Sequence, residues 1–299
     1  MAEAFEFVPC VLCGQRETRR FAPGKGLAQL VRCRNDGLVF LNPRPTAFAL
    51  REFHAGFVRE DNTELFDGYR REILRREAEA VKQLVPEGSL LDVGCAIGTF
   101  FEFFPVDCWR RFGVDTSGLG VQRTMEHHPA QIFQGTLAEA HFPRNFFDVV
   151  TILDMLYYAP DPAAELCEVH RILKDDGVLA VEIPGLAYTR LRASAPACWL
   201  LEGRSGPGLA NSRHLYHFSP QTIRRLLGGC GFRVQQMLPE QASLGGGRFR
   251  QRLNRWHFQF ARTVHRATLG KVSVAGKELY LARKEPDARV WKSVGLGRA

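Results

Sequence analysis

Short apolar runs alternate along the chain with longer amphipathic segments. The runs are too short for helices and end at turn-forming or polar residues, so we predict strands there. The predicted strands span 90–93, 111–115, 132–137, 146–154, 177–184, 232–238 and 278–283. Helical spacing predicts helices over 68–85, 116–127, 161–173 and 220–227, the first with its charges on a solvated face. Strands that alternate with helices form a parallel sheet, whose ligands bind at the carboxyl ends of the strands.

The first predicted strand leads into a tight turn that contains two glycines. Asp92 is followed by Gly94 and Gly98, and then by the apolar-rich stretch 99–104. Gly94 can adopt a positive φ and lets a ligand approach the backbone, while the following helix presents unpaired N–H groups. Asp92 can accept a hydrogen bond from a ligand ammonium group or anchor the turn. Such turns also bind dinucleotides or no ligand at all, so the turn alone does not identify the ligand.

Polar residues and turn residues end the other predicted strands as well. Asp115 ends the second strand, where a carboxylate can accept from both hydroxyls of an adenosine ribose. Thr136, Asp154 and Pro184 fall at the ends of the third, fourth and fifth strands. Because parallel strands share one carboxyl edge, we expect these residues to surround one pocket.

Taken in order, these motifs resemble those of the class I S-adenosylmethionine-dependent methyltransferases, over roughly residues 68–284. The resemblance implies an α/β, Rossmann-like fold with a seven-stranded, mostly parallel sheet, helices on both faces and an antiparallel last strand. It also implies S-adenosylmethionine as methyl donor. The family's cofactor-binding motifs fall on Asp92, Gly94, Cys95, Ala96, Gly98, Asp115, Thr136, Leu137, Leu153 and Asp154.

The sequence departs from the family pattern at three places. Ala96 stands where the middle glycine of the first motif is usual, and Thr136 stands near the place of an acid beside the adenine. Tyr157 and Tyr158 replace the Glu-His pair of many small-molecule members, which excludes any mechanism that needs that histidine. These changes leave open a protein that binds the cofactor and has lost catalysis.

Residues 1–45 carry a separate pattern of cysteines. Cys10 and Cys13 lie in a Cys-x-x-Cys-Gly turn, and Cys33 begins a second such turn with Asp36 in place of its second cysteine. Two turns of this kind that face each other make a four-ligand zinc site. The segment resembles the zinc ribbon of a subgroup of small-molecule methyltransferases, including sugar C-methyltransferases, in which four cysteines hold the metal. Either Asp36 supplies an oxygen ligand to a structural zinc, or the ribbon is metal-free.

Residues 46–284 form the predicted methyltransferase domain. Within it, periodicity disappears over 185–219, which is typical of a lid or substrate loop. His214 and His217 end this stretch, just before a capped helix. Histidine titrates near neutrality, so both are candidates for the general base, although either can instead cap or pack. Tyr158 is a third candidate catalytic residue, as a side chain that positions an acceptor.

The basic character of the chain lies at its C-terminal end. The net charge is +8, yet residues 240–299 contain 13 Lys and Arg against 4 Asp and Glu. A predicted basic helix over 247–268 carries an apolar stripe, and 285–299 is predicted to be a basic tail. The stripe packs on the domain or on a second subunit, or the helix lies on an anionic membrane surface or attracts a phosphorylated substrate. The stripe comprises Phe249, Leu253, Trp256, Phe260 and Val264.

The composition and the N-terminal residues indicate where in the cell the protein is located. No stretch approaches the ~20 apolar residues of a transmembrane helix, and the N-terminus lacks the pattern of a secretory signal, so we expect a cytoplasmic protein. The resemblance implies O-, N- or C-methylation of a small molecule, and the zinc-ribbon relatives suggest a sugar, a polysaccharide precursor or a secondary metabolite as acceptor, as in natural-product biosynthesis. The alternative is an RNA methyltransferase that uses the ribbon and the basic end. Nucleic acid is disfavoured because no aromatic-basic platform stands out in the ribbon.

Overall fold

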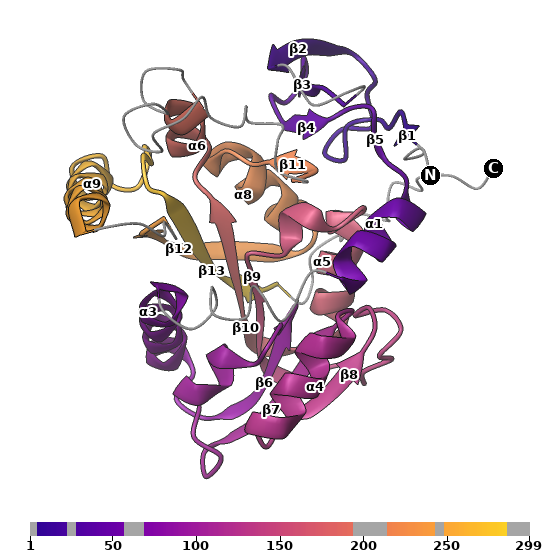
Figure 1. Ribbon diagram of the computed structural model, residues 1–299, viewed down its shortest axis with the longest axis vertical. Helices are drawn as coiled ribbons and strands as arrows, with labels where there is room; N and C mark the ends of the chain where they lie inside the picture. The colour runs from indigo at the N-terminus through magenta and orange to yellow at the C-terminus, as the bar shows by residue number, and fades with distance from the viewer. Residues whose placement is uncertain (1–4, 23–27, 57–68, 194–213, 243–247, 286–299) are drawn as a thin grey trace.

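A seven-stranded sheet forms the centre of the computed structural model, which describes residues 5–22, 28–56, 69–193, 214–242 and 248–285 (Figure 1). The strand order is β12-β13-β10-β9-β6-β7-β8. β13 is antiparallel to both β10 and β12, and the other four pairs are parallel. The predicted α/β fold with a mostly parallel sheet is therefore confirmed. The strands are β6 (Gly88–Val93), β7 (Trp109–Asp115), β8 (Gln131–Gln134), β9 (Phe147–Leu153), β10 (Leu173–Pro184), β12 (Phe232–Glu240) and β13 (Lys277–Lys284).

Helices cover both faces of the sheet, because successive residues of a buried strand point to opposite sides. Leu90 joins the apolar cluster beneath α3 (Tyr69–Leu84). Its neighbour Leu91 joins the other cluster, which contains residues of α5 (Pro162–Ile172) and α8 (Pro220–Gly229). Neither residue has measurable exposure, which explains why β6 reads as an unbroken apolar run in the sequence.

Two elements, β10 and the helix after β7, begin at residues other than those we predicted. β10 begins at Leu173, four residues before the predicted start of this strand at residue 177. Its pairing with β9 shifts register between Leu173 and Val178. The helix after β7 is α4 (Gly118–His127), and Ser117 caps it by accepting from the amide of Gly120.

The N-terminal segment forms a small sheet that includes one strand from a part of the chain distant in sequence. The order is β11-β4-β3-β2, with β11 antiparallel to β4. β11 lies near the end of the predicted lid region 185–219, so this end of the region belongs to the N-terminal sheet (Figure 1). The apolar residues of the segment belong to the same cluster as those of α5 and α8. The strands are β2 (Thr18–Ala22), β3 (Leu30–Cys33), β4 (Val39–Leu41) and β11 (Tyr216–His217), beside a second pair, β1 (Phe5–Glu6) and β5 (Arg44–Pro45).

Arg44 connects the N-terminal segment to the main domain. Its side chain is almost fully buried and donates to the carbonyl of Pro160 at 2.6 Å and to the hydroxyl of Tyr216 at 3.0 Å. Its Nε pairs with Glu6 at 2.9 Å. The guanidinium thus holds the loop after β9, the strand β11 and the N-terminal segment in one arrangement.

The remaining elements surround the carboxyl edge of the sheet. They are α1 (Ala47–Ala55), the 3-10 helices η2 (Thr99–Phe103) and η3 (Leu156–Tyr158), α6 (Leu186–Ala193) and α9 (Arg248–Ala267). Most of the predicted lid, residues 194–213, lies outside the described residues, as does the predicted tail from 286 onward. Within the described ranges, none of the helices is long and apolar enough to cross a bilayer.

Candidate active site

A cavity of about 380 Å³ opens at the carboxyl ends of β6, β7 and β9. The fold brings nine of the ten predicted cofactor residues to its wall, and the tenth, Gly98, lies just outside it. The wall also includes the predicted Tyr158, whereas His214 and His217 are not part of it. The nine are Asp92, Gly94, Cys95, Ala96, Asp115, Thr136, Leu137, Leu153 and Asp154.

The turn after β6 depends on backbone conformations that favour glycine. Gly94 has φ 80°, and a Cβ there would lie 2.9 Å from Cγ of Met155. Gly98 has φ 78°, and a Cβ there would lie 2.6 Å from Cγ2 of Thr124 on α4. Gly98 therefore lets the turn close against α4. Ala96 between them has φ 49°, so a residue with a side chain occupies a left-handed position at the wall of the cavity.

Asp115 ties this turn to the next crossover. One carboxylate oxygen accepts from the amide of Ala96 at 2.8 Å, and the other accepts from the amide of Ser117 at 2.8 Å. Burial raises the pKa of Asp115, although these amides oppose the shift. The carboxylate faces the cavity and is held by the backbone, so a ligand hydroxyl would meet an acceptor whose position is already fixed.

Asp92 lies deeper, near the end of β6. Its Oδ1 accepts from the hydroxyl of Thr151 at 2.6 Å, and its side chain is almost fully buried. Burial raises the pKa of Asp92 to about 6, against the opposing effect of Thr151. A cationic group in the cavity would favour the ionised form, because an opposite charge offsets the cost of burying the carboxylate.

After the third strand, Thr136 lines the cavity near the place where the family often has an acid. Its amide and its hydroxyl both donate to Glu139 at 2.8 Å, so the hydroxyl is already engaged. The neighbouring Leu137 is buried and contributes an apolar side to the wall.

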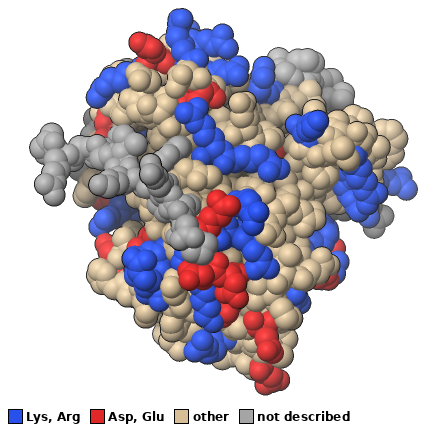
Figure 2. Space-filling view, turned by 180° about the vertical axis from the view of Figure 1, so that it is seen from behind, with Lys and Arg blue, Asp and Glu red and all other residues tan. Residues whose placement is uncertain are grey.

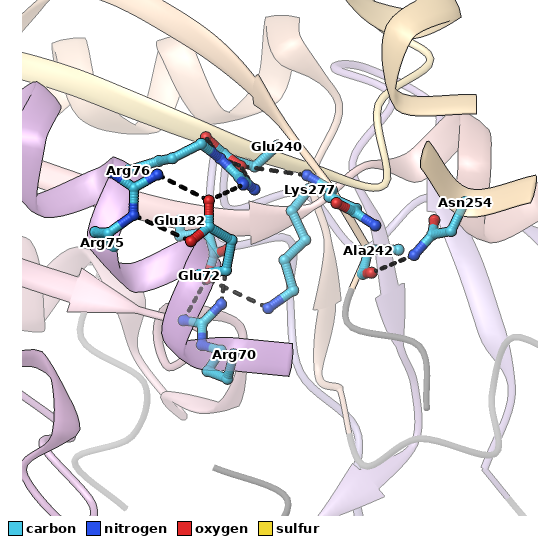
Figure 3. Close-up of polar contacts among 10 residues, drawn as sticks. Arg70, Glu72, Arg75, Arg76, Glu182, Glu240, Ala242, Asn254 and Lys277 are labelled. Carbon is cyan, nitrogen blue, oxygen red and sulfur yellow. Dashed lines mark hydrogen bonds and ion pairs between the residues drawn. The ribbon is translucent and has the colours of Figure 1, made fainter. Parts of the chain in front are cut away.

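Asp154 follows β9 with φ 60° and belongs to a buried group of charges. Its Oδ1 accepts from the hydroxyl of Tyr157 at 3.0 Å, and its Oδ2 lies 3.2 Å from Arg70 and also pairs with Lys277. Glu182, which is fully buried, pairs with the same two cations at 2.6 and 3.4 Å; Figure 3 shows Arg70 and Lys277 approaching it from α3 and β13. Burial disfavours the charged form of Asp154, but Lys277 and Arg70 outweigh it and hold the pKa below its ordinary value.

The sequence predicts that the charges of α3 lie on a solvated face. In the structure, some of them are buried instead. Only 11% of the Arg70 side chain is exposed, and Arg70 lines the cavity. Arg76 also turns inward and pairs with Glu240 at 2.8 Å (Figure 3). The expectation was wrong because the acidic partners, Glu182 and Glu240, come from distant strands and cannot be identified from the helix alone.

Comparison with known families agrees with this geometry. A family model described as a methyltransferase domain matches residues 63–237, more than half of the chain. The chain belongs to the S-adenosylmethionine-dependent methyltransferases. This methyltransferase therefore uses S-adenosylmethionine as its methyl donor, as the motif resemblance implied.

Solved structures share the fold of this methyltransferase at low sequence identity. A methyltransferase from Thermotoga maritima, described as a possible histamine N-methyltransferase, is 20% identical with a TM-score of 0.50, and the match covers 79% of this chain and 100% of that one. One from Archaeoglobus fulgidus is 15% identical with a TM-score of 0.50, over 75% and 98%. The plantazolicin methyltransferase BpumL, in complex with SAH, is 13% identical with a TM-score of 0.50, over 79% and 96%. A search of curated proteins found no match.

Beyond the cofactor residues, the cavity wall of this methyltransferase continues to Tyr158. The hydroxyl of Tyr158 lies 3.1 Å from Nε2 of His214, and the His214 ring lies 4.3 Å from that of Tyr157. Burial lowers the pKa of His214 to about 4, so the imidazole is neutral. His217 lies behind it in β11, with its ring 5.8 Å from that of His214 and a pKa that burial lowers to about 3. His217 therefore contacts His214 and does not itself line the cavity.

Sequence reasoning missed Glu165, a carboxylate on the same wall. It lies in the first turn of α5, where an acidic residue is ordinary, so no local signal distinguished it. Burial raises its pKa to about 7, with further contributions from Asp161 and Glu168. His54 of α1 was missed too, because residues 46–67 show no clear pattern; its ring lies 5.7 Å from that of Tyr158.

The four predicted metal ligands lie together in the N-terminal segment. Their ligand atoms are all within 4.8 Å of one another, with Cys10 Sγ 3.2 Å from Asp36 Oδ2 and Cys13 Sγ 3.6 Å from Cys33 Sγ. The amide of Leu38 holds the other oxygen of Asp36 at 2.9 Å, which leaves Oδ2 facing the thiols. Zn–S bonds of ~2.3 Å in a tetrahedron place sulfurs a little under 4 Å apart, so this donor set fits zinc.

Proposed function

We propose that this methyltransferase transfers the methyl group to an oxygen, nitrogen or carbon atom of a small molecule. The observation that carries the proposal is the continuity of the cavity, whose wall runs from the turn at Gly94 to Tyr158 and Glu165. A sulfonium supplies an already activated methyl group, so the protein has only to align the acceptor and, where needed, accept its proton.

On this proposal, the carboxylates at the strand ends hold the cofactor. Asp115 would accept hydrogen bonds from the ribose hydroxyls, and Asp92 would face the ammonium group of the methionine portion. Leu137 would pack beside the adenine. These assignments are supported by the place of each side chain on the cavity wall and by the raised pKa of the two buried carboxyls, which gain most from a polar or cationic partner.

We infer that Tyr158 and His214 act on the acceptor side. Tyr158 lies on the wall and would hold an acceptor hydroxyl or amine, while His214 would take the proton through the Tyr158 hydroxyl. The hydrogen bond of 3.1 Å between them supports this order. Glu165 is the competing proton acceptor, because it is on the wall and has a pKa of about 7. His217 is assigned a positioning role, since its ring contacts that of His214 and does not line the cavity.

The acceptor class can be tested by methylation assays with a labelled methyl donor. Sugars, polysaccharide precursors and secondary metabolites would be offered in parallel with RNA, and transfer to a small molecule that is lost in Asp115→Ala is expected. Calorimetry with S-adenosylmethionine checks the binding step separately. Transfer to RNA with none to any small molecule would overturn the proposed acceptor class. Normal cofactor binding with no transfer to any acceptor would favour the catalytically silent alternative.

We further propose that Cys10, Cys13, Cys33 and Asp36 hold a structural zinc ion. The clustering of four ligand atoms within 4.8 Å supports this proposal. Zinc there would join the two turns of the N-terminal segment and so stabilise the sheet to which β11 belongs. Metal analysis of protein purified without chelator should find about one zinc per chain. A content below a few tenths of an equivalent would contradict it.

A further inference from the structure

One side of α9 is exposed over the length of the helix where side chains are described. Its residues recur at spacings of three and four, which places them on a single helical face. We call them the basic-aromatic face. They are Arg252, Arg255, Trp256, Gln259, Phe260, Thr263, Arg266 and Ala267.

The opposite side of α9 holds the helix on the domain. Asn254 is buried and donates to the carbonyl of Ala242 at 2.8 Å, as Figure 3 shows, and Ala261 is buried as well. Phe258 lies under the guanidinium of Arg76 at 5.2 Å, and the ring of His257 lies 4.6 Å from that of Tyr188. Because these contacts fix the helix, the exposed aromatic residues of the face are not needed for packing.

Two large aromatic side chains project from the basic-aromatic face. Trp256 is 78% exposed and Phe260 is 54% exposed, one helical turn apart. Sequence periodicity had placed both on one stripe with Leu253 and Val264, which left packing on the domain open. Their exposure rules out that packing. Just after the helix, Leu269 is 86% exposed and Val272 is 47% exposed, so aliphatic residues extend the same end of the molecule.

The charge of α9 has one sign. The helix contains six arginines and no Asp or Glu. Figure 2 shows Lys and Arg side chains gathered at the edge of the molecule that α9 forms. Within the described part of the chain, Arg252, Arg255 and Arg266 make no ion pair with an acidic residue, so their charge is available to a partner.

We propose that the basic-aromatic face lies on a bilayer that contains anionic phospholipid. Arginines attract the negative headgroups, and Trp and Phe side chains insert at the boundary between headgroups and acyl chains. Trp is enriched at that boundary because its ring is apolar and its N–H is polar. Leu269 and Val272 add apolar area that would enter the same boundary.

Charge and shape make other occupants less suitable. A second copy of the chain, docked by the same face about a two-fold axis, would place arginines opposite arginines. A single-stranded nucleic acid would use the arginines and the aromatic rings but would leave Leu269 and Val272 in water. The proposal goes beyond the methyl-transfer function and does not depend on the identity of the acceptor.

Vesicle flotation with the full chain tests the proposal. The protein should float with vesicles of phosphatidylcholine mixed with phosphatidylglycerol and stay behind with phosphatidylcholine alone. W256A/F260A and R252E/R255E should each lower the bound fraction about tenfold or more. The matched controls are F48A, an exposed Phe on α1, and R19E/R20E, two exposed arginines on β2, and both should bind as the wild type does. Equal flotation of the face variants and their controls would overturn the proposal.

Two further measurements separate insertion from adsorption and from nucleic-acid binding. The tryptophan emission of the wild type should shift to shorter wavelength with anionic vesicles, and W256F should float normally without that shift. Every variant should bind S-adenosylmethionine as the wild type does, which shows that it is folded. Tight binding of a single-stranded RNA oligonucleotide, together with no flotation on anionic vesicles, would assign the face to nucleic acid instead.

Discussion

Nε2 of His214 lies 3.1 Å from the hydroxyl of Tyr158, so a buried imidazole contacts the cavity through a tyrosine. The two residues come from different layers of the structure. Tyr158 ends η3 after β9, whereas His214 immediately precedes Leu215 and β11, which pairs with β4 of the N-terminal sheet. The amide of Leu215 also donates to the carbonyl of Tyr157 at 2.9 Å. The geometry of this pair therefore depends on how the N-terminal segment is seated.

The pH profile of methyl transfer should identify the proton acceptor. His214 has a pKa of about 4, so a rate that depends on its neutral form should be flat above about pH 5. Glu165 has a pKa of about 7, and only its ionised form accepts a proton, so kcat/KM would rise with pH up to about 7 and then level off. We expect the flat profile, measured with the best acceptor found.

Variants of Tyr158 and Glu165 should show whether His214, acting through Tyr158, or Glu165 accepts the proton. Tyr158→Phe should lower kcat by about a hundredfold without changing the affinity for S-adenosylmethionine. The variant lacks the hydroxyl through which His214 would take the proton. Glu165→Gln should have a small effect, and His127→Asn, at an exposed surface histidine, should have none. A rate lost in Glu165→Gln and kept in Tyr158→Phe would move the role to Glu165.

Cofactor affinity should depend on the ionisation of Asp92. The pKa of Asp92 is raised to about 6 by burial, so below that pH the empty site holds a neutral carboxyl. A cationic ligand must then release the proton, which weakens binding by up to about tenfold per pH unit below 6. Calorimetry from pH 5 to 8 should show this slope in the wild type and a lower, pH-independent affinity in Asp92→Asn. An identical slope in that variant would assign the effect to another group.

Replacing Ala96 with glycine should stabilise the protein. Ala96 has φ 49°, a conformation that costs an L-residue with a side chain roughly 1–2 kcal/mol, of which about half is lost again to the greater flexibility of glycine. Ala96→Gly should therefore raise the free energy of unfolding by about 0.5–1 kcal/mol in urea titrations. The same change at Ala164, exposed in the first turn of α5, should instead lower it, by about 0.5 kcal/mol. Equal destabilisation by both would show that Ala96 is not strained.

The parts of this structure that sequence could predict are those specified by neighbouring residues. The strand at Leu90 and the turn at Gly94 follow from local patterns, and the family order of strands then places Asp115 beside them. The group around Glu182 could not be predicted, because its partners Arg70 and Lys277 meet only through the pairing of β10 with β13 and the packing of α3. A pattern within one helix carries no information about such partners.

The surroundings of His217 and of the apolar stripe on α9 could not be predicted from the sequence either, because both depend on contacts that local patterns do not reveal. His217 ends the predicted lid region just before a capped helix, which made it a candidate general base, but its strand pairs with β4, far away in the sequence. Trp256 and Phe260 have the spacing of packed residues, yet α9 uses Asn254 and Ala261 for its buried side. Small and polar residues at an interface leave a weaker periodic signal than large apolar ones.

Removal of Asp36 should test the zinc proposal. In Asp36→Ala the site keeps three thiols, so we expect a loss of most bound zinc and a lower melting temperature in purified protein. Asp36→Cys should retain zinc more strongly against a chelator, because it completes a four-thiolate set. Asp176→Ala, at an exposed residue of β10, serves as the control and should leave both the metal content and the melting temperature unchanged. No difference among the three proteins would indicate a metal-free ribbon.

Lys277 should be essential for stability because it compensates two carboxylates inside the protein. It pairs with Asp154 and with the fully buried Glu182, and its own side chain is 9% exposed. Lys277→Met keeps the length of the side chain and leaves Arg70 as the remaining cation that both carboxylates share. Removing one partner of a buried charge group costs about 3–5 kcal/mol, which urea unfolding at neutral pH would measure.

The deficit of Lys277→Met should also depend on pH. Without the lysine, the folded protein gains by protonating one of these carboxylates, so its pKa rises above that of the unfolded chain. The folded state then binds more protons than the unfolded state, and the stability of the variant recovers toward the wild type as the pH falls from 8 to about 5. Lys271→Met removes an exposed lysine and should change stability by less than about 0.5 kcal/mol at every pH. A deficit that is independent of pH would mean that the loss comes from packing rather than from uncompensated charge.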